Sequence, residues 1–228
     1  MLTSFKSIHF SVSKKSRAGL PRGASAKWGF TLVELIVVIT IATIIMTALV
    51  IQQRKWDDQL SLNTQTYELA LTLRQAQIYS LGVRENPTST GDKFNLGYGV
   101  RISDPIPNQY IFFGDKNKDF KYTTGEELET KTFTRGVVVD RVCGMASIIA
   151  LGPVGEHCSG EGWPVTLEMV DISFLRPEVN SKSKFLNSSQ TEISGFGSYS
   201  LPATIYLRSP QGKFSSVKIE ANGQISIQ

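Results

Sequence analysis

The sequence has few of the side chains that usually carry catalysis or bind metal ions. It contains two histidines, His9 and His157, and two cysteines, Cys143 and Cys158, in 228 residues. With so few of them, the sequence offers no Ser/His/Asp or Cys/His relay. It also lacks a glycine-rich phosphate-binding loop. We therefore expect that the protein is not an enzyme.

Acidic residues are absent from positions 1–29, which carry six basic residues: Lys6, Lys14, Lys15, Arg17, Arg22 and Lys27. The whole chain has 24 basic and 20 acidic residues and a net charge of +4, so without this segment the net charge is −2. The basic character therefore belongs to the N-terminal segment. The remaining chain has no overall attraction to nucleic acid.

Charge is almost absent from the next segment, where Glu34 is the single ionisable residue among the 22 residues of Phe30–Ile51. A helix of about 20 apolar residues crosses a bilayer core of roughly 30 Å. In lipid a helix satisfies its own backbone polar groups, so the many β-branched residues do not oppose it. A buried core helix is the alternative, but the length and the flanking charge favour a membrane span. The basic N-terminal flank predicts a single-pass protein of the inner (cytoplasmic) membrane, with its N-terminus in the cytoplasm and its C-terminal domain outside.

The residues that precede the apolar segment do not fit an ordinary secretory signal, which has its small-residue cleavage site after the apolar core. The chain resembles type IV pilins and type II secretion pseudopilins in the motif Gly29-Phe30-Thr31-Leu32-Val33-Glu34. The resemblance implies cleavage after Gly29 by a prepilin peptidase, methylation of the Phe30 amine and loss of the leader, residues 1–29. The leader is longer than is usual in this family. The span lacks the proline that many relatives carry, which predicts a less interrupted helix.

A carboxylate at Glu34 needs a physical reason, because a charge within a membrane costs at least about 2.5–3.5 kcal/mol. One hypothesis is that Glu34 pairs with the α-amine of Phe30 on the same or a neighbouring subunit and so sets the register of assembly. The other is that Glu34, one turn into the span, reaches the inner membrane surface. The family resemblance favours the assembly role.

The helix is predicted to continue beyond the membrane over residues 52–84, since no proline or glycine occurs before Gly82. Small and apolar residues repeat there at helical spacing in Leu62, Leu69, Leu73, Ala76 and Ser80. A second set is expected to widen the buried face: Leu60, Tyr67, Leu71 and Ile78. We expect one face to dock on a sheet and the other on neighbouring helices. The run LALTLRQAQIYSLGVRE resembles the helix of the GspH/FimT type of minor pseudopilin.

Residues 85–228 are predicted to form a β-rich domain. Short β-branched and aromatic runs occur at Tyr98–Ile102, Gln109–Phe113, Leu128–Phe133, Val137–Arg141, Ala146–Leu151, Thr166–Val170, Ile172–Leu175, Ala203–Leu207, Ser215–Glu220 and Gln224–Ile227. The Ser-rich residues 178–200 are expected to form a loop. The C-terminal run ATIYLRSPQGKFSSVKIEANGQISI resembles the last hairpin of the same pseudopilin type. The expected fold is α+β, a pilin fold in which a long N-terminal helix packs on an antiparallel sheet.

Two further sites are predicted outside the helix. Cys143 and Cys158 are expected to form a disulfide in an oxidising compartment. The alternative is a metal site, because the two cysteines and His157 offer three metal ligands, although a structural zinc site uses four. The second site is a possible calcium loop, in which Asp115, Asn117, Asp119 and Glu126 have the ligand spacing of an EF-hand loop, with Phe120 where glycine is required. Its alternative is a polar hairpin loop.

These features predict a minor structural subunit of a type II secretion pseudopilus or type IV pilus. Its expected partners are other pilin or pseudopilin subunits, a prepilin peptidase, an inner-membrane assembly platform and membrane lipid. The alternative is a pilus-tip subunit that binds DNA during uptake, through the late basic residues Lys182, Lys184, Arg208, Lys213 and Lys218. The net charge of −2 favours a solvated face over a DNA site.

Overall fold

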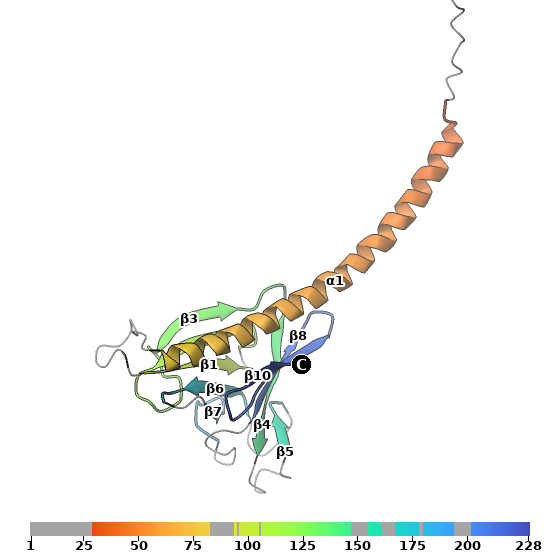
Figure 1. The fold of residues 1–228 in the computed structure, drawn as a ribbon. Coiled ribbons are helices and arrows are strands. Elements are labelled where there is room, and N and C mark those ends of the chain that lie inside the picture. Colours follow the sequence, from red (N-terminus) through yellow and green to blue (C-terminus); the bar gives the residue numbers. More distant parts are fainter. Residues whose placement is uncertain are drawn as a thin grey trace, which may run out of the picture. The chain divides into compact units, whose positions relative to one another are not determined.

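The computed structural model describes residues 29–82, 94, 96–104, 106–146, 155–160, 167–177, 180–193 and 202–228. One long helix, α1, precedes all the strands and spans Leu32–Leu81. The strands form antiparallel sheets, so the chain has the predicted α+β class (Figure 1). The chain divides into two compact units, with the first part of α1 in Met1–Met46 and the rest of the helix, with all the strands, in Thr47–Gln228.

Helix α1 begins after an N-cap residue and ends before a glycine. Thr31 precedes the helix, and its Oγ1 accepts the backbone N–H of Glu34 at 3.2 Å, which is an N-cap bond. Gly82 follows the helix and donates its N–H to the carbonyl of Ile78 at 2.9 Å. Between them the helix is continuous, as the sequence predicts. Among the described residues, α1 is the helix long and apolar enough to cross a membrane.

The strands form two sheets of five strands each. The first sheet has the order β3-β2-β1-β6-β7, with β1 Gly97–Ser103, β2 Gln109–Asp115, β3 Glu127–Thr132, β6 Met169–Phe174 and β7 Ser181–Leu186. The second has the order β10-β9-β8-β4-β5, with β4 Val138–Ala146, β5 Gly155–Cys158, β8 Ala203–Arg208, β9 Phe214–Ile219 and β10 Ile225–Ile227. Each pair of neighbouring strands is antiparallel.

One hydrophobic core joins the second part of α1 to both sheets. Leu62, Leu69, Leu73 and Ala76 are fully buried in it, together with residues of β1, β2, β4, β6, β8 and β9. The predicted helix seam is therefore confirmed. The second apolar set does not widen this buried face, because its four members are 59–65% exposed. Packing of the helix against the sheet domain uses one side of α1 and leaves the other open.

The structure corrects the expected strands at three places. Residues 178–200 were expected to be a loop, but β7 lies within them and pairs with β6. Ser181 and Ser183 are 2% and 3% exposed, because their small side chains fit a covered strand despite their polarity. The two expected strands Thr166–Val170 and Ile172–Leu175 are replaced by the single strand β6. The sequence did not predict β5. Residues 147–151 of the expected strand Ala146–Leu151 lie outside the described residues.

A close approach between the sheets depends on a glycine. A Cβ on Gly144 in β4 would collide with the ring of Phe185, which belongs to β7 in the other sheet. The ring of Phe185 is 2% exposed. The absence of a side chain at Gly144 therefore lets a large aromatic residue fill the space between the two sheets.

Candidate functional site

The residues of the expected cleavage site lie just before the first turn of α1. Gly29 and Phe30 are outside the helix, and the side chain of Phe30 is 80% exposed. A Cβ on Gly29 would meet no heavy atom within 4 Å. The chain itself therefore has room for a side chain at position 29, so any requirement for glycine must come from an enzyme that binds this segment.

Glu34 lies in the first turn of α1, two residues after the helix begins. Because Thr31 is the N-cap, Glu34 is the third helical residue, which is where the acidic residue of a capping box occurs. A carboxylate there is also stabilised by the helix dipole. Sequence reasoning missed this capping position, although the spacing Thr-x-x-Glu is its known signature. The expected ion pair with the Phe30 amine requires cleavage and stays a prediction.

An apolar stripe lies along the open side of α1 in the second unit. It consists of Leu60, Tyr67, Leu71 and Ile78, whose exposed fractions are 62%, 59%, 63% and 65%. Their spacing of seven, four and seven residues puts them on one helix face. Large apolar side chains this exposed on one face indicate a contact surface for another molecule. We refer to these four residues as the outer stripe.

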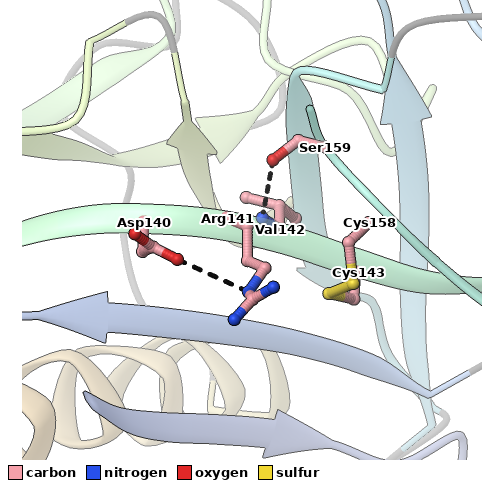
Figure 2. The surroundings of a disulfide bond; sticks show 6 residues. All are labelled: Asp140, Arg141, Val142, Cys143, Cys158 and Ser159. Atoms are coloured by element: carbon pink, nitrogen blue, oxygen red, sulfur yellow. Dashed lines mark hydrogen bonds and ion pairs between the residues drawn. A yellow bond between two sulfur atoms is a disulfide. The ribbon is translucent and has the colours of Figure 1, made fainter. Parts of the chain in front are cut away.

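The expected disulfide between Cys143 and Cys158 is present, with a Cα–Cα distance of 4.0 Å (Figure 2). The two residues are directly opposite each other in β4 and β5, so strand pairing brings them together. Ser159 extends this pairing, because its N–H donates to the carbonyl of Val142 and its Oγ accepts the N–H of Val142. With both sulfur atoms in the disulfide, the alternative of a metal site with His157 loses two of its three ligands.

The segment expected to bind calcium forms a compact loop after β2. The buried carboxylate of Asp115 accepts the backbone N–H groups of Lys118, Asp119 and Phe120 at 2.7, 3.3 and 2.9 Å. Burial raises the pKa of Asp115 to about 6, against the effect of these hydrogen bonds. Glu126 is also buried and accepts the N–H groups of two loop residues at 2.8 Å each. These carboxylates therefore organise the loop's own backbone.

The remaining calcium candidates complete the same network. Asn117 Oδ1 accepts the N–H of Asp119, and Asp119 Oδ1 accepts the N–H of Lys121. Phe120 has a φ of 64°, so a non-glycine residue provides the left-handed turn at the position where an EF-hand loop has glycine. Within the part of the chain that the structure describes, no three His, Cys, Asp or Glu side chains are grouped to hold a metal ion. Calcium binding stays a prediction.

Basic residues expected to form a DNA-binding patch are largely paired with acids. Lys184 contacts Glu192 at 2.7 Å, Arg208 contacts Asp140 at 2.9 Å and Lys218 contacts Glu220 at 2.7 Å. Lys182 and Lys184 lie in β7 of the first sheet, whereas the other three lie on β8, on β9 or in the turn between them. Pairing reduces the positive charge that these residues offer to phosphates.

A buried charge pair that sequence reasoning missed fixes the calcium-candidate loop to the sheet. Arg101 in β1 and Asp171 in β6 are 4% and 0% exposed. The guanidinium Nη2 also donates to the carbonyl of Tyr122 at 3.3 Å, and its carbon lies 4.6 Å from the centre of the Tyr122 ring. Tyr122 in turn donates its backbone N–H to Asp171 at 2.9 Å. The sequence offers one indication of this pair, which is that Arg101 and Asp171 each stand between two apolar residues.

Comparison with known proteins does not assign the chain to a family. No protein-family model matches it, and no curated protein or solved structure matches it significantly. The structure has a long N-terminal apolar helix whose second part packs on antiparallel strands, which is compatible with a pilin-like fold.

Proposed function

We propose that this chain is a minor structural subunit of a type II secretion pseudopilus or type IV pilus. The observation that carries the proposal is that α1 is apolar from Leu32 to Ile51 and then continues, within the domain, into the outer stripe. A helix that only anchors a domain in a membrane needs no exposed apolar residues beyond the bilayer. A helix that also packs against helices of other subunits does need them.

The N-terminal residues support the same function. Gly29 and Phe30 are outside the helix and exposed, so a membrane peptidase can reach the bond between them. Cleavage there would leave the apolar helix at the new N-terminus and create an α-amine four residues before Glu34. Other pilin or pseudopilin subunits, the peptidase, an inner-membrane assembly platform and lipid are then the partners that the chain requires.

The proposal is tested by determining the N-terminus of the protein extracted from membranes. Mass spectrometry is expected to find a methylated Phe30 as the first residue. Gly29→Leu is expected to prevent cleavage and leave a product heavier by about 3 kDa, on the order of 110 Da per leader residue. Because Gly29 has open space around its Cα, the variant tests the peptidase and not the fold. An N-terminus beyond residue 51 would contradict the proposal, since the anchor would then be lost.

A further inference from the structure

A groove lies beside the first turns of α1 beyond the apolar run. Its volume is about 470 Å³, and it is lined by Gln52, Trp56, Gln59, Leu60, Asn63 and, from the turn between β8 and β9, Lys213. Gln52 directly follows Ile51, the last residue of the apolar run. Trp56 lies about 7 Å further along the helix axis than Ile51, at 1.5 Å per residue. Headgroup regions extend roughly 5–8 Å beyond the hydrocarbon core, so a bilayer around the apolar run has its headgroups beside this groove.

The side chains in the groove suit the surface of a bilayer. The side chain of Trp56 is 71% exposed, which is unusual for tryptophan in water but normal where its ring meets lipid headgroups. Lys213 is exposed and makes no ion pair with any acid in the described parts of the chain. Three amide side chains line the same groove and offer hydrogen bonds to phosphate and glycerol oxygens.

A second turn brings another cation to this end of the domain. Gly136 packs against Pro210, since a Cβ on Gly136 would lie 2.9 Å from the Pro210 Cγ. This contact holds the turn between β3 and β4 beside the turn that carries Lys213. Thr134 in the same turn donates its N–H to Gln65 of α1 at 3.1 Å, which fixes the turn to the helix. Arg135 is exposed between these two contacts.

Both cations and acids occur in this region of the chain. Arg135 and Lys213 come from the turns, and the sequence places Arg54 and Lys55 just after the apolar run. The acids on the same stretch of α1 are Asp57, which is exposed, and Asp58, which is 9% exposed. Basic residues next to a membrane span attract anionic lipid, and Lys213 is the basic residue that lines the groove.

We propose that this groove binds the headgroup of an anionic phospholipid, with Lys213 at the phosphate and Trp56 at the boundary between headgroups and acyl chains. The inference rests on the proposed membrane anchoring of α1. A helix of a neighbouring subunit suits the groove less well, because three of its six lining residues are amides and one is a lysine. That helix suits the outer stripe, which is apolar and shares only Leu60 with the groove.

The test uses the full chain in bilayer discs, with Trp56 as the only tryptophan through Trp28→Phe and Trp163→Phe. Quenching of its fluorescence by brominated phosphatidylglycerol is compared with quenching by brominated phosphatidylcholine at equal mole fractions. One lysine near the surface is expected to enrich the anionic lipid about fivefold beside Trp56. Lys213→Gln is expected to remove the preference, whereas Lys213→Arg keeps it. Lys218→Gln is the matched control, because Lys218 is paired with Glu220.

Each alternative result has a distinct meaning. Equal quenching by both lipids, or an unchanged preference in Lys213→Gln, overturns the headgroup site while the anchoring stands. No quenching by either lipid shows that α1 does not bring Trp56 to a bilayer, which overturns both this inference and the proposed anchoring. A preference that disappears as subunits are crowded in the disc, with cross-links across the groove, assigns the groove to a neighbouring subunit and overturns the lipid site.

Discussion

Arg101 and Asp171 form a two-bond ion pair across the neighbouring strands β1 and β6. Arg101 Nε donates to Asp171 Oδ1 and Nη2 donates to Oδ2, each at 2.6 Å, and the two residues are directly opposite in the strand register. Both side chains are withdrawn from water, so each charge depends on the other for compensation. The pair links the first sheet to the loop that follows β2, through Tyr122.

We expect Arg101→Met to lower the free energy of unfolding by about 3–5 kcal/mol, because it leaves a buried carboxylate without its partner. The double variant Arg101→Met/Asp171→Leu is expected to recover most of this loss. Urea unfolding of the full chain in micelles measures both. Lys218→Met is the control, since its pair with Glu220 is solvent-exposed and should contribute little to stability. Equal losses in the single and double variants would show that packing, and not charge, is responsible.

The stability of the domain is expected to depend on pH through Asp115. Burial raises the pKa of Asp115 to about 6 from 3.8, so the folded state binds its proton more tightly than the unfolded state does. The free energy of unfolding contributed by this group is therefore greatest below about pH 4 and declines as the pH rises to about 6. Asp115→Asn, which does not titrate, is expected to flatten this part of the stability curve. Parallel curves for wild type and variant would contradict the prediction.

The calcium hypothesis makes a separate prediction for the same loop. A site built from Asp115, Asn117, Asp119 and Glu126 would bind calcium with a dissociation constant on the order of 10⁻⁴–10⁻³ M, as extracellular modules do. Millimolar calcium would then raise the melting temperature at pH 7, and Asp119→Ala would abolish the rise. Magnesium is the control ion, since it demands a stricter octahedral geometry. An unchanged melting temperature would leave the loop as a hydrogen-bonded hairpin connection.

Reduction of the Cys143–Cys158 disulfide is expected to destabilise the domain. The bond closes a loop with a sequence separation of 15 residues, which corresponds to about 3 kcal/mol when the unfolded chain is constrained by the cross-link. Unfolding with and without reductant measures the effect, and non-reducing peptide mapping identifies the pair. The double variant Cys143→Ser/Cys158→Ser should be as unstable as the reduced protein and insensitive to reductant. A reductant effect that persists in this variant would rule out the disulfide as its cause.

Variants of Glu34 are expected to separate helix capping from assembly. Glu34→Leu should be processed and inserted in the membrane, since a buried charge is removed, but it should fail to join filaments. Glu34→Gln keeps a residue type that a capping box accepts at its third helical position and lacks the charge, so it should fail in the same way. The measurement is the amount of each variant in sheared filaments relative to membranes. Normal incorporation of Glu34→Gln would mean that the residue acts as a cap and not through an ion pair.

Two leucines on the same helix are expected to behave in opposite ways. Leu71→Ser changes the outer stripe at a side chain that is 63% exposed, so it should leave the melting temperature unchanged and reduce filament incorporation. Leu69→Ser changes a side chain that is 0% exposed and should destabilise the domain by about 2–5 kcal/mol. Thermal unfolding and filament incorporation are measured for both. Full incorporation of Leu71→Ser into filaments would show that the outer stripe is not part of the assembly surface.

The sequence predicted those features that depend on residues close together in the chain. Helical spacing identified the buried seam from Leu62 to Ala76, and alternation identified most strands. The strand β7 was missed because Ser181, Ser183 and Lys184 become buried only through pairing with β6, which local composition does not reveal. The ion pair of Arg101 with Asp171 was missed for the same reason, since 70 residues separate its members. The cap at Thr31 was local and could have been found.

The order of the strands has a consequence for how the domain can be made. Strand β1 pairs with β6, which follows β4 in the chain, and β4 pairs with β8, which follows β6 and β7. The two sheets are therefore interleaved along the chain, and neither can be completed from one continuous half of it. In the proposed topology, an emerging chain would have an unpaired edge on β4 until Ala203–Arg208 has crossed the membrane. Folding of the second sheet would then require almost the entire polypeptide, and contacts between residues far apart in the chain form slowly.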